Sequence, residues 1–101
     1  MDVIAVSSHR GEFFRILQET ARSQTAVMTI APGADAGPEE EHAGDQILYV
    51  LEGEARVRIG NREYDASPGA LVMIPAHTPH HVRSTGTHPL FFLTVYAPPA
   101  Y

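Results

Sequence analysis

The stretch Gly37–Gly53, GPEEEHAGDQILYVLEG, places acidic residues, a histidine and a glutamine directly before a run of strand-forming residues that ends at a glycine. The run Gln46–Leu51 is the strongest strand candidate in the chain, because it is rich in aliphatic and aromatic residues and is bounded by turn signals. A second polar cluster, PAHTPHH, occupies Pro75–His81. We expect the two clusters to converge on one metal ion inside a small β-barrel.

The remaining segments are short and are separated by Gly, Pro or Asn, a pattern typical of all-β proteins. Gly60-Asn61 predicts a two-residue hairpin between the strands Glu54–Ile59 and Arg62–Ala66, because both turn residues tolerate a positive φ. The segment Ala70–Ile74 is apolar throughout, which predicts a buried strand.

The two ends of the chain and its polar segments complete the strand pattern. Residues 11–20 fit a strand or a short helix, and we favour the strand because residues 26–30 read as its neighbour. Glu40–His42 and His80–Arg83 read as short polar strands. Residues 97–101 contain two prolines and are expected to lie extended over the surface. About nine short strands without a long helix predict a β-sandwich or β-barrel.

Composition limits the classes of function. At 101 residues the chain is expected to form one domain over residues 1–101, with the barrel core at about 25–96. A net charge of −5 disfavours nucleic acid and anionic membranes as partners. The absence of cysteine excludes disulfides, zinc–thiolate sites and thiol nucleophiles. Without an apolar segment of a signal peptide or a membrane span, we expect a cytoplasmic location.

Strand alternation selects four candidate metal ligands. Residues i and i+2 of a strand share a face, so Glu40 and His42 point the same way, opposite to the neighbouring glutamates. Gln46 begins the inward face of the strongest strand, and His80 belongs to the second cluster. Oxygen and imidazole ligands together suit a first-row divalent metal such as Fe, Mn, Ni, Zn or Cu. We therefore predict a metal site formed by Glu40, His42, Gln46 and His80.

At these residues the chain resembles the cupins, in particular single-domain proteins of the cupin 2 conserved-barrel type. The first cupin motif ends at Gly53, which is preceded by six intervening residues. In this alignment Gln46 stands at the glutamate position of the motif, and Glu40 and His42 stand at its His-x-His pair. The combination of Glu-x-His with Asp-Gln is similar to a subset labelled mannose-6-phosphate isomerase-like, a label that reflects fold more than activity.

The second cupin motif falls on the Pro75–His81 cluster. Pro75 matches the motif, His77 replaces its glycine, His80 stands at the metal-binding histidine, and Ser84 replaces its asparagine. The resemblance spans Thr25 to Tyr96. It implies a double-stranded β-helix, or jelly-roll, fold and a metal centre in which two of the four usual ligand positions are substituted.

Several roles remain open at the level of the residues. Gln46 is either a direct ligand or a group that orients Glu40 or a metal-bound water. Glu40 is the only plausible general base among the four. His77 and His81 are expected at the rim or surface. Tyr96 or Phe92 could line the mouth of the pocket.

Three functions fit this site. The first is a metal-dependent enzyme that acts on a small polar organic molecule by dioxygenation or isomerisation. The second is a non-catalytic module that binds a sugar or small acid. The third is a barrel with a purely structural metal. We also predict a homodimer, because so small a barrel has exposed sheet edges, with Phe13–Leu17 as the candidate interface.

Overall fold

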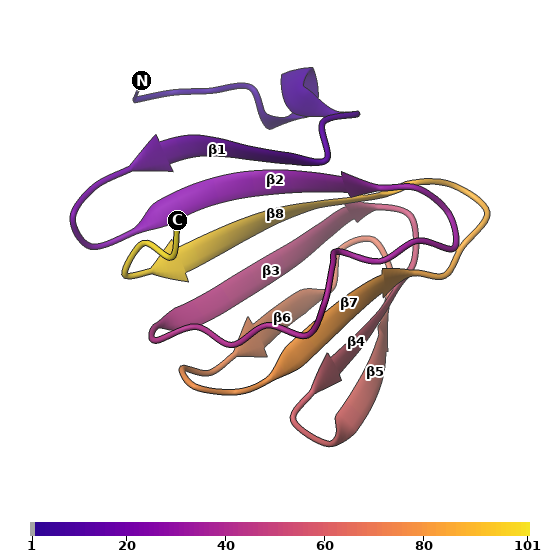
Figure 1. Cartoon of the computed structure of the whole chain (residues 1–101). Coiled ribbons are helices and arrows are strands. Elements are labelled where there is room, and N and C mark those ends of the chain that lie inside the picture. The colour runs from indigo at the N-terminus through magenta and orange to yellow at the C-terminus, as the bar shows by residue number, and fades with distance from the viewer. Residues whose placement is uncertain (1) are drawn as a thin grey trace.

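Antiparallel strands form the framework of the molecule (Figure 1). The structure is a computed structural model that describes residues 2–101. Within these residues, eight strands follow one short 3-10 helix. In chain order the elements are η1 Val6–His9, β1 Phe14–Glu19, β2 Gln24–Ile30, β3 Asp45–Glu52, β4 Ala55–Ile59, β5 Arg62–Ala66, β6 Leu71–Ile74, β7 His80–Ser84 and β8 Leu90–Ala97.

The strands form two sheets that enclose one core. The larger sheet has the order β1-β2-β8-β3-β6, and the smaller sheet has the order β5-β4-β7. Side chains of both sheets meet in a single hydrophobic cluster, so the sheets pack face to face as in a jelly roll. The all-β prediction is confirmed. The buried members of the cluster are Met28, Ile30, Leu48, Val50, Ala55, Val57, Ala66, Val82, Leu90 and Phe92.

The predicted strand alternation holds in the centre of the barrel. Leu48 and Val50 are fully buried on β3, whereas the intervening Tyr49 is 39% exposed. The hairpin between β4 and β5 forms at Gly60-Asn61 as predicted, with Ile59 opposite Arg62. Residues 14–19 form a strand, so the alternative of a short helix is excluded there.

Two predicted strands differ from the structure. Glu40–His42 is not a strand; only Glu40 pairs, in an isolated bridge with His80. β6 is buried on one face only, since Leu71 and Met73 are 72% and 54% exposed whereas Ile74 is buried. β6 is the last strand of the larger sheet and only one of its faces meets the core, which an entirely apolar sequence does not reveal.

The final residues also depart from the prediction. The backbone after β8 folds back toward the barrel instead of extending over the surface, and the Tyr101 side chain contacts Tyr96 and Phe14. Among the described residues there is no helix with the length and hydropathy needed to cross a membrane.

Candidate metal centre

The inner face of the larger sheet changes from apolar to polar toward one end. There β2, β8 and β3 are in register, so that Gln24 lies opposite Tyr96 and Tyr96 lies opposite Gln46. Because alternate residues share a face, the next inward-facing rows belong to the same surface. Two rows further along, this surface is apolar and consists of Met28, Phe92 and Val50. The larger sheet thus contributes a polar row at one end of the hydrophobic core.

Main-chain hydrogen bonds hold Glu40 beside His80. The Glu40 amide donates to the His80 carbonyl at 3.0 Å, and the His80 amide donates to the Glu40 carbonyl at 2.9 Å. Two residues further on, the His42 carbonyl accepts a hydrogen bond from the His77 amide at 2.7 Å. The two clusters that the sequence singles out are therefore joined along their backbones.

The side chains of Glu40, His42 and His80 converge. One ligand atom of each lies within 4.8 Å of the others. His42 Nε2 lies 3.5 Å from Glu40 Oε2. Metal–ligand bonds of about 2.0–2.2 Å separate the ligands of one ion by roughly 3–4 Å, so this spacing suits a shared ion.

His80 is oriented by its own loop. Its side chain is buried, and Nδ1 lies 3.0 Å from the Thr78 carbonyl oxygen. A carbonyl can only accept, so Nδ1 carries a proton, and in the neutral tautomer Nε2 is the nitrogen with the lone pair. A hydrogen bond of this kind typically fixes the tautomer of a metal-ligating histidine.

His42 has an unsatisfied nitrogen. Its Nε2 is buried without a hydrogen-bond partner among the described residues. The ring packs against aromatic neighbours, with centroid distances of 5.3 Å to His80 and to Tyr96. Burial lowers the pKa of His42, and the nearby His80 lowers it further, although Glu40 acts in the opposite direction. These surroundings favour the neutral imidazole, which is the form that binds metal.

Gln46 lies beside this group with one of its amide atoms unpaired. Its Nε2 donates to Thr94 Oγ1 at 3.0 Å, while its Oε1 is buried with no partner in residues 2–101. A buried polar atom without a partner is rare and calls for a specific explanation. Together, an amide oxygen, a carboxylate and two imidazoles fit a first-row divalent ion.

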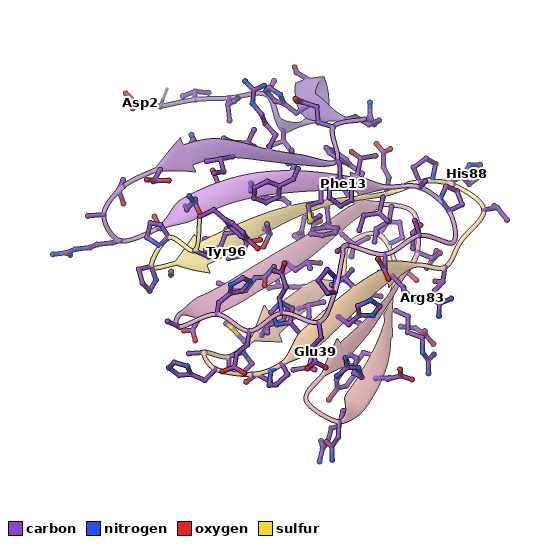
Figure 2. All side chains as sticks on the ribbon, viewed as in Figure 1. Asp2, Phe13, Glu39, Arg83, His88 and Tyr96 are labelled. Carbon is purple, nitrogen blue, oxygen red and sulfur yellow. The ribbon has the colours of Figure 1, made fainter. Side chains whose placement is uncertain are left out.

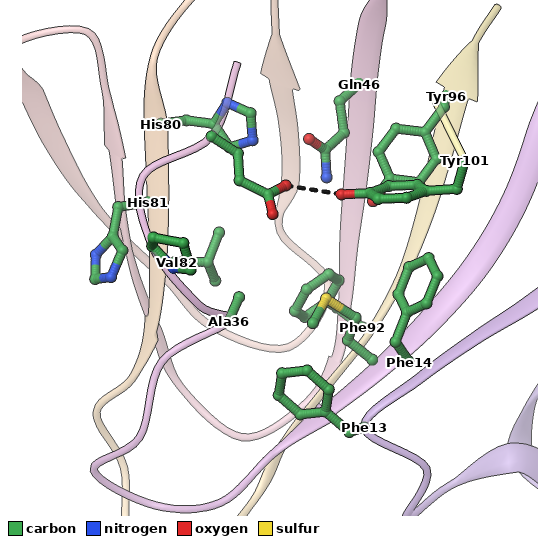
Figure 3. A pocket seen from close by; sticks show the side chains of 13 residues that line it. Phe13, Phe14, Ala36, Gln46, His80, His81, Val82, Phe92, Tyr96 and Tyr101 are labelled. Atoms are coloured by element: carbon green, nitrogen blue, oxygen red, sulfur yellow. Dashed lines mark hydrogen bonds between the residues drawn. The ribbon is translucent and has the colours of Figure 1, made fainter. Parts of the chain in front are cut away.

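A cavity of about 250 Å³ opens beside these residues (Figure 3). Glu40, Gln46 and His80 line its polar end, whereas His42 lies outside the lining. Tyr96 and Phe92, which the sequence suggested for the mouth of the pocket, belong to its wall, and both are buried. Burial raises the pKa of Tyr96 to about 12, so its hydroxyl remains protonated. The other lining residues are Phe13, Phe14, Met28, Ala36, Pro38, His81, Val82 and Tyr101.

Sequence reasoning did not identify Tyr101 or Gln24. The Tyr101 hydroxyl donates to Glu40 Oε2 at 2.7 Å (Figure 3). Gln24, which is fully buried, holds the backbone of this segment: its Nε2 donates to the Tyr101 carbonyl and its Oε1 accepts from the Ala100 and Tyr101 amides. No local pattern marks either residue, because 77 positions separate the two partners.

The remaining histidines of the second cluster lie at the periphery. His77 is exposed, and its Nδ1 lies 3.9 Å from Glu41. His81 lines the cavity but pairs with Asp35 at 3.1 Å. His88 is exposed and lies at the opposite end of the molecule from Tyr96 (Figure 2). The expectation of rim or surface positions for His77 and His81 agrees with these locations.

Comparison with known proteins agrees with this architecture. The family model of the cupin domain matches residues 26–96. This chain is a cupin. The solved structure of BH2720 from Bacillus halodurans is similar to this cupin, with 34% identity and a TM-score of 0.87 over 94% of this chain and 76% of that one.

Two further relatives add to the comparison. The uncharacterized protein YrkC of Bacillus subtilis is 32% identical over 82 residues, which is 75% of this chain and 44% of YrkC. A Klebsiella pneumoniae protein with a double-stranded β-helix domain shares the fold, with 24% identity and a TM-score of 0.86 over 100% of this chain and 94% of that one. This cupin spans less than half the length of the first two curated relatives that it matches.

Proposed function

We propose that this cupin binds one divalent transition-metal ion through Glu40, His42 and His80, and that the ion presents a small organic ligand to the cavity. The observation that supports this most strongly is the convergence of one carboxylate and two imidazoles within 4.8 Å at the polar end of the core. Gln46 is the fourth polar group, either as a direct ligand or as the partner of a metal-bound water. Fe, Mn, Ni, Zn and Cu all suit such a donor set.

The proposed activity is isomerisation or dioxygenation of the ligand. A bound ion would supply Lewis acidity or an oxygen-binding centre. Glu40 is the proposed general base, because it is the only carboxylate among the residues that line the cavity. The Tyr101 hydroxyl, which donates to Glu40, would keep this carboxylate oriented toward the cavity.

Metal analysis tests the proposal. The protein, purified without chelating resin, is expected to carry close to one ion per chain, and the variants His42→Ala and His80→Ala should lose it. His88→Ala removes an imidazole at the opposite end of the molecule and should keep it. A metal-free wild type whose thermal stability does not respond to added Mn, Fe, Ni or Zn would refute the proposal.

The alternative is a binding module that does not turn its ligand over. It is favoured by the cavity's single carboxylate, since isomerases commonly need an acid and a base. A ligand that raises the melting temperature and is recovered unchanged would support this alternative. A third possibility is a structural metal, in which case a chelator should destabilise the barrel and no ligand should bind.

We also propose a homodimer and retain the cytoplasmic location as a prediction. The predicted interface segment lies at one edge of the larger sheet, where Phe13 and Ile16 are 56% and 38% exposed. The resemblance to mannose-6-phosphate isomerase-like cupins stays a prediction as well, and mannose 6-phosphate is therefore one of the ligands to be tested.

A further inference from the structure

The cavity has one polar end and an otherwise apolar wall. The oxygen and nitrogen atoms of Glu40, Gln46 and His80 meet at one side, and the opposite side is formed by phenylalanine, methionine and valine side chains (Figure 3). A ligand that fills this space must place an apolar body against that wall.

The charge of the lining restricts the ligand further. The chain has no lysine, and none of its seven arginines lines the cavity. Arg58 and Arg56 instead pair with acidic residues outside it. Of the two histidines that line the cavity, His80 belongs to the proposed metal site and His81 pairs with Asp35. Apart from a metal ion held by Glu40, His42 and His80, a phosphate group entering the cavity would meet no arginine or lysine, and the apolar wall would not replace its lost hydration.

The Tyr101 side chain is a phenol in the wall of the cavity, and its contacts show which neighbours a phenol finds there. Its ring packs at 5.0 Å from Phe14, 5.3 Å from Tyr96 and 5.7 Å from His42, measured between centroids. Its hydroxyl donates to Glu40 Oε2. The chain thus places a phenol among three rings, with its single oxygen directed at the candidate metal ligand.

We propose that the cavity binds a small ligand with an aromatic, ring-sized body and a single oxygen-donor head directed at Glu40, His42 and His80. The orientation of the oxygen-donor head toward the metal ligands rests on the proposed function. The preference for a ring-sized body rests on the apolar cavity wall. It favours phenols and aromatic monocarboxylates over sugar phosphates. The ligand ring binds beside Tyr101, or in the position of the Tyr101 ring when that side chain is removed.

The first experiment uses the metal-loaded wild-type protein and compares phenylacetate with mannose 6-phosphate by calorimetry. Phenylacetate is expected to bind at least about tenfold more tightly, which corresponds to a difference of about 1.4 kcal/mol in binding free energy. Equal affinity, tighter binding of the sugar phosphate, or binding of neither probe would overturn the inference.

The second experiment removes the Tyr101 ring by mutation and supplies a similar ring as a free molecule. The variant Tyr101→Ala should bind 4-methylphenol, which is the tyrosine side chain as a free molecule, at least about tenfold more tightly than the wild type does. Tyr101→Phe keeps the ring and should bind it no better than the wild type. Tyr64→Ala removes a similarly exposed tyrosine from β5, outside the cavity, and should also show no gain.

These measurements separate the two proposals. Circular dichroism verifies that each variant is folded, and metal content is measured independently for each. If metal does not bind but 4-methylphenol still complements Tyr101→Ala, the proposed function fails and the ring preference stands. If metal binds and the aromatic probes fail, the ring preference is overturned and the metal site stands.

Discussion

Gln46 is the residue at which this chain departs most clearly from the cupin ligand pattern. Its amide stands at the position of the usual glutamate but carries no charge, and its Nε2 already donates a hydrogen bond to Thr94 Oγ1. Gln46 Oε1 and His42 Nε2 are both buried without a hydrogen-bond partner among the described residues. A neutral amide attracts a cation less than a carboxylate does, so affinity at this centre should be limited by this one residue.

Restoring the charge at this position should strengthen metal binding. We predict that Gln46→Glu raises affinity by about tenfold or more, the lower end of the effect of residues that support metal ligands. The Thr94 hydroxyl can rotate to donate to the new carboxylate, so the fold should tolerate the change. Competition with a chelating dye measures the effect. Asn61→Asp adds the same charge at the distant hairpin turn and should leave affinity unchanged.

His42 gives the metal-free protein a pH dependence. Burial lowers its pKa in the folded state, whereas the unfolded chain takes up a proton near the ordinary value of about 6.5. Between these two pKa values the unfolded chain binds a proton at His42 and the folded protein does not. The free energy of unfolding therefore decreases as the pH falls from about 6.5 to the lowered pKa of the folded state. We predict a melting temperature that falls from pH 7.5 to 5.5 in the presence of a chelator.

The contribution of His42 is isolated with matched variants. His42→Gln should reduce the slope of melting temperature against pH, while His88→Gln, an exposed change at the far end, should keep the wild-type slope. An unchanged slope in His42→Gln would contradict the prediction.

At the scale of elements, the site depends on how β3 passes into β4. The turn places Gly53 at φ +81 directly against the backbone that leads into β8, so that a Cβ there would lie 2.5 Å from the Pro89 carbonyl oxygen. Because β8 carries Tyr96 and β3 carries Gln46, this contact fixes the two strands that support the polar row. The glycine that ends the first cupin motif is therefore required by packing as well as by its φ.

A comparison of two glycines separates these causes. Gly69 also has a positive φ, +93, but no atom lies within 4 Å of a Cβ built there. We predict that Gly69→Ala destabilises by about 1–2 kcal/mol, from backbone strain alone, and that Gly53→Ala destabilises by about 3 kcal/mol or more. Urea denaturation measures both. Equal losses would show that the close approach to β8 has no effect of its own.

At the scale of the whole molecule, the larger sheet leaves apolar side chains uncovered beside β6. Leu71 and Met73 are 72% and 54% exposed, and Tyr49, opposite Leu71, is 39% exposed. The N-terminal residues cover the other half of the same face, where Arg10 lies over the Phe91 ring at 5.7 Å. The uncovered half is thus a second candidate for the dimer interface, beside the predicted segment Phe13–Leu17.

The dimer prediction is testable at both edges. Sedimentation at micromolar concentration is expected to show a dimer of the wild type. If the exposed side chains of β6 form the interface, Leu71→Glu with Met73→Glu yields a monomer, because two charges would be buried without partners. In that case Ile16→Glu, which places one charge at the opposite edge, leaves the dimer intact. Dissociation by Ile16→Glu alone would instead assign the interface to Phe13–Leu17, and a monomeric wild type would refute the dimer.

The sequence by itself predicted an all-β sandwich or barrel, because turn chemistry and strand alternation are local properties of the chain, and its resemblance to the cupins implied the jelly roll and the grouping of Glu40, His42 and His80. The strand expected at Glu40–His42 is reduced to a single bridge in the structure. It also located Gln46, through its spacing from Gly53. Only the tertiary structure decided that Leu71 and Met73 face outward and that Tyr101 reaches Glu40. These facts depend on which strand ends a sheet and on a Gln24 contact across 77 positions, and no local pattern encodes either.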